Sequence, residues 1–152
     1  MACKQVPEVG DALLKAIQKT FMDMAFVDII PADGGQEVNY SSVLYINFFQ
    51  PVAGGMILRL SKECKMTIVE NVHGSDWESL TSDEIDDCLL EILNVLAGNF
   101  LNEYCGKSIG HNMSFPQLLF DEQEVVDLGE YASYYFDAEG VIFQVDVCVK
   151  GK

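Results

Sequence analysis

The stretch from Thr81 to Cys105 constrains this chain more than any other, because nearly every position in it agrees with one long helix. Thr81 and Glu84 have the spacing of a capping box, in which each side chain bonds the backbone N–H of the other. Acidic residues at 83, 84, 86 and 87 crowd the first turns, where the helix dipole favours negative charge. Gly106 supplies a stop at the other end. The pattern therefore predicts a helix over 81–105.

Two faces of this helix differ in composition when it is wound at about 100° per residue. The apolar stripe contains Leu89, Leu93, Leu96, Phe100 and Tyr104, with Ile85 and Ile92 alongside. The opposite side, here called the polar face, contains Asp87, Glu91, Asn94 and Gly98 and no lysine. A mid-helix asparagine has poor propensity, and a glycine costs about 1 kcal/mol against alanine. Residues that weaken the helix indicate another role for this face, and the alternative is a solvated surface with no role.

Charge and hydropathy exclude several classes of function. The net charge is −15, with nine basic residues in 152, whereas nucleic acids and anionic membranes bind basic surfaces. No apolar run approaches the roughly 18 residues that cross a bilayer, and the N-terminus has no secretory apolar segment. We therefore expect a cytoplasmic protein that binds neither nucleic acid nor membrane, with residues 1–152 forming one domain.

The candidate metal-ligating and nucleophilic residues form no recognisable catalytic set. Five cysteines are scattered without C-x-x-C spacing, which favours buried reduced thiols over disulfides or zinc. The histidines, His73 and His111, lie far apart and are interpreted as incidental. The chain has no H-E-x-x-H, no carboxylate cluster at metal-ligand spacing and no serine in a nucleophile elbow. We expect no metal and no cofactor of the protein's own, and a self-sufficient hydrolase is hard to build from these residues.

Periodicity predicts the remaining elements. Helices are expected over 8–25 and 62–72, and strands over 26–30, 38–49, 56–60, 109–115, 131–136 and 141–149. Turn signals lie at 33–35, at 51–55 and in the D-A-E-G segment at 137–140, and an acidic loop is expected over 121–130.

A faint internal repeat appears when the chain is laid against itself with a shift of 76. Lys15 then aligns with Glu91, and Gln18 with Asn94. Each of the two helices is followed by a strand, a turn-rich loop and a hairpin. This predicts an α+β fold of two pseudo-symmetric helix-plus-three-strand halves, which form an antiparallel sheet with helices packed on it. Chance similarity between two amphipathic helices is the alternative.

The spacing on the polar face resembles the signature of a known family. Asp87-x3-Glu91-x2-Asn94, followed by Ala97-Gly98 and by Pro116 in an S-F-P segment, is similar to the motif of the CheC/CheX/FliY chemotaxis phosphatases. Here 21 residues separate Asn94 from Pro116, one fewer than is usual in that family. The G-G-M-I-L-R-L segment at 54–60 also looks like that family. With a single motif copy, the chain resembles CheX rather than CheC.

The resemblance implies a phosphatase that acts on the aspartyl phosphate of a CheY-like response regulator. Such a regulator brings its own magnesium ion and lysine, so the task that remains is to hold a water in line with the phosphorus. By the resemblance, Asn94 would orient that water and Glu91 would pair with the regulator's lysine. Asp87 and Gly98 would contact the partner, and Pro116 would shape the chain beside the site.

Two functions of other classes also fit the sequence. A non-catalytic binding module could dock a response regulator or a motor-switch component through the same face. A purely structural domain would bury that face in a subunit contact, and exposed hairpin edges would also allow a homodimer to form sheet to sheet. A crystal in which Glu91 and Asn94 are exposed and not covered by another subunit would argue against the purely structural domain.

Overall fold

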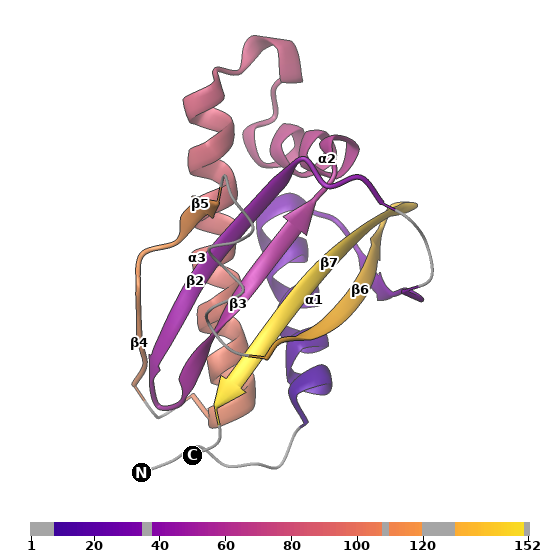
Figure 1. Ribbon diagram of the computed structural model, residues 1–152. Coiled ribbons are helices and arrows are strands. Elements are labelled where there is room, and N and C mark those ends of the chain that lie inside the picture. The colour runs from indigo at the N-terminus through magenta and orange to yellow at the C-terminus, as the bar shows by residue number, and fades with distance from the viewer. Residues whose placement is uncertain (1–7, 35–37, 108–109, 120–129, 151–152) are drawn as a thin grey trace.

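Antiparallel pairing joins the described strands into one sheet, and α1 and α3 cover one of its faces (Figure 1). The computed structural model describes residues 8–34, 38–107, 110–119 and 130–150. The helices are α1 (Val9–Ala25), α2 (Lys62–His73) and α3 (Ser82–Cys105), with a short 3₁₀ helix η1 (Trp77–Ser79) before α3. The strands are β1 (Ile29–Pro31), β2 (Ser42–Gln50), β3 (Ala53–Leu60), β4 (Asn112–Met113), β5 (Gln117–Leu119), β6 (Ala132–Ala138) and β7 (Val141–Lys150).

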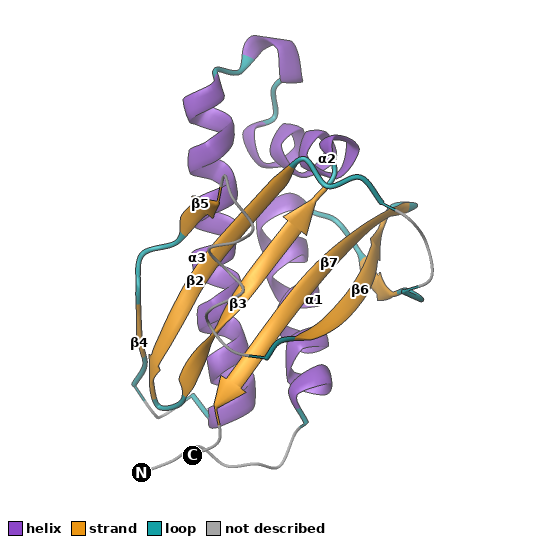
Figure 2. Cartoon of the chain, in the orientation of Figure 1, coloured by secondary structure: helices purple, strands orange, loops and turns teal. Residues whose placement is uncertain are grey.

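The order of the strands has an internal symmetry. It runs β1-β6-β7-β3-β2-β4, and β5 also pairs with β2 (Figure 2). Along the path β1-β6-β7-β3-β2-β5, each element of α1-β1-β2-β3 has a counterpart in α3-β5-β6-β7, and exchanging the counterparts gives the same path read from its other end. β3 and β7 pair in the middle, and each half lends its first strand to the hairpin of the other, β1 to β6 and β5 to β2. The predicted α+β fold of two pseudo-symmetric halves is confirmed, with α2 as the additional helix between them.

The two long helices use corresponding positions to pack on the sheet. Adding 76 to each buried position of α1 gives a buried position of α3. These α1 positions are Ala12, Leu13, Ala16, Ile17, Thr20, Phe21 and Ala25. The predicted apolar stripe of α3 is buried, with Leu89, Leu93, Leu96 and Phe100 all 0% exposed and Tyr104 8% exposed. The repeat seen in the sequence is therefore a repeat of packing.

Both ends of α3 lie where the sequence predicts them. Thr81 Oγ1 accepts a hydrogen bond from the Glu84 N–H at 3.1 Å, and Glu84 Oε1 accepts one from the Thr81 N–H at 2.9 Å. Gly106 ends the helix at φ 101°, a backbone conformation that favours glycine. The capping box thus sets where the helix starts.

The first residues of β1 and β3 differ from the predicted starts of these strands. The strand expected over 26–30 begins at Ile29, because Phe26 ends α1 in the left-handed conformation at φ 58°. Gly54 and Gly55, expected in the turn, lie within β3. Gly54 is required there because a Cβ would lie 1.9 Å from the carbonyl oxygen of Cys148 on β7. Close approach of two strands, rather than a turn, accounts for this glycine pair.

The strand expected over 109–115 is shorter among the described residues. Its described part forms β4, and a further short strand, β5, follows Pro116. Proline has no N–H to donate to the neighbouring strand, so pairing is interrupted beside it. The strand predicted over 38–49 likewise begins only at Ser42. The acidic loop expected over 121–130 lies outside the described residues except for Glu130.

The described cysteines agree with the prediction of core thiols. Cys64, Cys88, Cys105 and Cys148 are buried and free of disulfides, and Cys3 lies outside the described residues. Within the described part of the chain, no helix combines the length and apolar character needed to cross a bilayer.

Leu93→Ala tests whether the apolar stripe carries the stability of the fold. Leu93 projects from α3 into the core and is fully buried, so its truncation leaves a cavity. We expect the free energy of unfolding to fall by about 2–5 kcal/mol, measured by urea denaturation. Lys15→Ala, on the exposed side of α1, is the control and should change it by less than about 0.5 kcal/mol. Equal effects of the two variants would contradict the packing described here.

Candidate functional site

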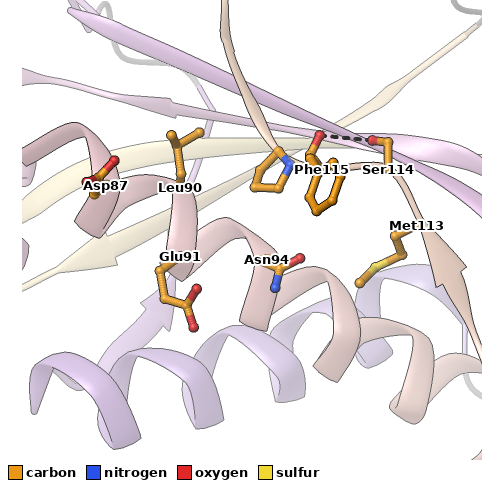
Figure 3. A pocket seen from close by; sticks show the side chains of 8 residues that line it. Asp87, Leu90, Glu91, Asn94, Met113, Ser114 and Phe115 are labelled. Atoms are coloured by element: carbon orange, nitrogen blue, oxygen red, sulfur yellow. Dashed lines mark hydrogen bonds between the residues drawn. The ribbon is translucent and has the colours of Figure 1, made fainter. Parts of the chain in front are cut away.

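A cleft of about 460 Å³ lies between α3 and the interrupted edge of the sheet (Figure 3). One wall comes from α3, through Asp87, Leu90, Glu91 and Asn94. The other comes from the segment that joins β4 to β5, through Met113, Ser114, Phe115 and Pro116. The structure therefore brings together the predicted Asp87, Glu91, Asn94 and Pro116 in one place.

The polar face is directed outward, opposite the buried stripe of α3. Asp87 and Glu91 are exposed and Asn94 is half-buried. In Figure 3, Asn94 lies between Glu91 and Met113, and the ring of Phe115 stands on the opposite wall. The face is thus open to solvent in the folded chain.

The amide of Asn94 differs from its counterpart in the first half. Gln18 Nε2 donates a hydrogen bond to the Ile29 carbonyl of β1 at 3.0 Å, so strand and helix are joined there. Asn94 makes no side-chain hydrogen bond within the described part of the chain. In the second half the β4–β5 segment stands away from the helix and a cleft separates them. The Asn94 amide can therefore both donate to and accept from a molecule in the cleft.

The wall opposite α3 is held in place by Ser114. Its N–H donates to the Asn47 carbonyl of β2 at 3.0 Å, and its Oγ accepts from the Asn47 N–H at 2.9 Å. The same Oγ donates to the Phe115 carbonyl at 3.1 Å, the bond drawn in Figure 3. These bonds tie the segment to β2, so the position of this wall of the cleft is set by the sheet.

Asp87 and Glu91 also line a second cleft, of about 300 Å³, and so form a ridge between the two. This second cleft is lined further by Met24, Val72, His73, Glu84 and Cys88. No lysine or arginine occurs among the described residues lining either cleft. The ridge therefore attracts cations and repels an anion that arrives without its own counter-charge.

Cys88 is the only thiol among the described residues that line the clefts. Burial raises the pKa of the Cys88 thiol to about 11, so it is protonated near neutral pH and is a poor nucleophile. No group of three or more His, Cys, Asp or Glu residues suited to a metal ion occurs in the described ranges. In the first cleft the polar side chains are the amide of Asn94, the carboxylates of Asp87 and Glu91, and the hydroxyl of Ser114, which is already bonded to the Asn47 N–H and the Phe115 carbonyl.

Gly98 extends the polar face one turn beyond Asn94 but does not line the cleft. A Cβ at Gly98 would lie 3.6 Å from Cε1 of His111, an ordinary van der Waals distance. The imidazole of His111 therefore lies over this end of the face. A side chain of the same chain therefore borders Gly98, the residue that the resemblance assigns to partner contact.

Sequence reasoning missed four of the eight lining residues: Leu90, Met113, Ser114 and Phe115. Three of these belong to a segment that the sequence read as a regular strand. The adjacent Phe115-Pro116 pair was the available signal, because proline interrupts pairing and leaves its neighbours free to face a cleft.

Comparison with known proteins agrees with this architecture. The structure is similar to the CheX–CheY–BeF₃–Mg²⁺ complex from Borrelia burgdorferi, with a TM-score of 0.70 and 16% identity over 95% of this chain and 99% of that chain. It is also similar to the chemotaxis protein CheX from Vibrio vulnificus (TM-score 0.71, 15% identity, 95% and 97% covered). Thermotoga maritima FliY gives a TM-score of 0.62 with 16% identity, over 93% of this chain and 86% of that chain. These likenesses show the fold.

The sequence itself carries the family assignment. No curated protein sequence matches the chain. The family model described as chemotaxis phosphatase CheX matches residues 43–137, which are 95 of the 152 residues and include the whole of α3, β4 and β5. Because that match spans more than half of the sequence, this chain belongs to the CheX family of chemotaxis phosphatases.

Proposed function

We propose that this protein hydrolyses the aspartyl phosphate of a CheY-like response regulator by inserting Asn94 into the regulator's active site. The observation that carries the proposal is the free amide of Asn94, half-buried in an open cleft beside the exposed carboxylate of Glu91. An amide keeps its charge throughout a reaction and can hold a water by donating and accepting at once. We further propose that residues 1–152 act as one CheX-like domain.

The reaction needs little covalent chemistry from this chain. Water attacks the phosphorus, the bond between phosphorus and the aspartyl oxygen breaks, and inorganic phosphate and the regulator's free carboxylate result. Positioning of the water and neutralisation of charge supply most of the catalysis in phosphoryl transfer. The Borrelia complex contains CheY, BeF₃ and Mg²⁺. By analogy, the regulator brings the metal and its lysine, and this chain brings the amide.

Charge on the ridge suits a partner of that kind. Glu91 would pair with the regulator's lysine, and Asp87 would extend the contact along α3. Because the described cleft lining contains no cation, a free phosphate ester would be repelled, whereas a phosphate already neutralised by Mg²⁺ and lysine would be tolerated. Gly98, with His111 over it, would border the docked partner beyond Asn94.

Asn94→Ala and Glu91→Ala should impair the phosphatase in different ways. Loss of the water-orienting amide should lower the rate of phosphate release by about 100-fold or more while regulator binding survives. Loss of the Glu91 charge should weaken binding instead, and more strongly at low salt, where the pair is less screened. The measurements are phosphate release from phosphorylated regulators with Mg²⁺, regulator affinity and thermal melting.

Asn102→Ala is the matched control for Asn94, because it removes an amide about two turns further along α3 and outside the cleft. It should retain parental activity. Parental activity in Asn94→Ala would show that the catalytic role is assigned wrongly. If the parent binds regulators without dephosphorylating any of them, a non-catalytic binding module replaces the phosphatase as the function.

The first half should not contain a second active site. At the positions that match Glu91 and Asn94, Lys15 would repel the regulator's lysine, and Gln18 is already bonded to the Ile29 carbonyl. The double variant Lys15→Ala/Gln18→Ala should keep its phosphatase activity within about twofold and lose about 1 kcal/mol of stability, the usual worth of one hydrogen bond. A large loss of activity without unfolding would reveal a functional site on α1.

A thiol nucleophile would be the competing chemistry, and Cys88 is the residue placed to supply it. Since burial raises its pKa to about 11, only about one thiol in a thousand is ionised at pH 8. Phosphate release should therefore survive treatment with iodoacetamide and the change Cys88→Ala, with kcat within about twofold of the parent. Inactivation by the reagent that Cys88→Ala abolishes would establish a covalent mechanism instead.

A further inference from the structure

Phe115 is the most exposed large apolar side chain among the described residues, at 89% of its full exposure. A single exposed apolar residue is ordinary on protein surfaces. Phe115 differs in its position, because its ring forms part of the wall that faces Asn94 and Glu91. The cleft thus has one polar wall, on α3, and one largely apolar wall that ends in an aromatic rim.

The ring is presented on a backbone that the sheet holds in place. The residue before it, Ser114, exchanges two hydrogen bonds with Asn47 and donates a third to the Phe115 carbonyl. The residue after it is a proline, whose φ is restricted by its own ring. A partner that packs on Phe115 would therefore pay little to order this segment, which is the condition under which a contact contributes most to affinity.

We propose that Phe115 is the apolar docking residue for the phosphorylated receiver domain. Its ring would pack on an apolar patch that borders the regulator's phosphorylation site while Glu91 takes the lysine and Asn94 approaches the phosphorus. This inference rests on the proposed function. In this proposal the β4–β5 segment recognises the shape of the partner's surface. The carboxylates of α3 recognise its charge and cannot supply that apolar contact.

The extent of exposure points to a protein surface as the occupant. A small acyl phosphate held against Asn94 would lie within the cleft and leave the outer face of the ring in water. Only a surface that extends past the rim covers both the ring and the anionic ridge. Interfaces of this kind commonly combine a buried aromatic anchor with neighbouring charged pairs.

The test compares Phe115→Ala, Phe115→Leu and Phe49→Ala with the parent. Phe49 is a matched control, because it is also an exposed phenylalanine, at 53%, but is not among the residues lining either cleft. The first measurement is affinity for CheY-like regulators of the same organism, activated with beryllofluoride and Mg²⁺. The second is steady-state phosphate release at varied concentrations of phosphorylated regulator.

We expect Phe115→Ala to weaken binding and raise KM by about 10- to 30-fold, the range for an aromatic anchor, with kcat within about twofold. Phe115→Leu should restore most of the affinity, Phe49→Ala should match the parent, and all variants should melt as the parent does. This pattern is the opposite of the one expected for Asn94→Ala, which lowers kcat and spares binding.

Parental affinity in Phe115→Ala would overturn the docking role and leave the chemistry of Asn94 standing. A fall in kcat at unchanged KM would also overturn it, in favour of a role in positioning Asn94. If the parent binds the beryllofluoride-activated regulator but releases no phosphate from the phosphorylated one, the proposed function fails, and the binding comparison still decides the role of Phe115. If the parent binds no activated regulator, both proposals fall.

Discussion

Burial of the apolar stripe of α3 is the interaction on which the rest of the structure depends. Leu89, Leu93 and Leu96 are removed from water between the sheet and the neighbouring helix. Each fully buried leucine contributes about 1.5–3 kcal/mol through apolar burial alone. Because a helix is rigid, burying this stripe also determines its rotation about its axis. The opposite face, with Glu91 and Asn94, has to point outward once the leucines point inward.

The two halves of the chain share a packing scheme and differ in the hydrogen bonding of one amide side chain. In the first half, β1 lies near enough to α1 for Gln18 to bond the Ile29 carbonyl. In the second half, the chain between α3 and β6 is longer and pairs with β2 in two short pieces, β4 and β5. That arrangement opens a cleft above Asn94 instead of closing the strand onto the helix. The same symmetry therefore yields a structural contact on one side and an available functional group on the other.

In the proposed mechanism this chain contributes negative charge and an amide, and its partner contributes the cations. The ridge of Asp87 and Glu91 carries negative charge and has no described lysine or arginine in the clefts beside it. Such a surface cannot stabilise a transferring phosphoryl group by itself, because that group is anionic. It can recognise a cation-bearing active site that has already neutralised its phosphate. The absence of self-sufficient catalytic machinery in the sequence and the anionic cleft in the structure are thus consistent with one another.

The sequence by itself determined the elements whose signals are local and periodic: the long helix with its capping box, the sorting of its two faces, the repeat and the final hairpin. It also identified Asp87, Glu91 and Asn94 as one face, because helix geometry relates residues three and four apart without knowledge of the rest of the chain. Only the tertiary structure decided what stands opposite that face. Met113, Ser114 and Phe115 reach the cleft because Ser114 bonds to Asn47, a residue 67 positions earlier in the chain. Strand pairing over such distances depends on the whole sheet, and no local period in the sequence encodes it.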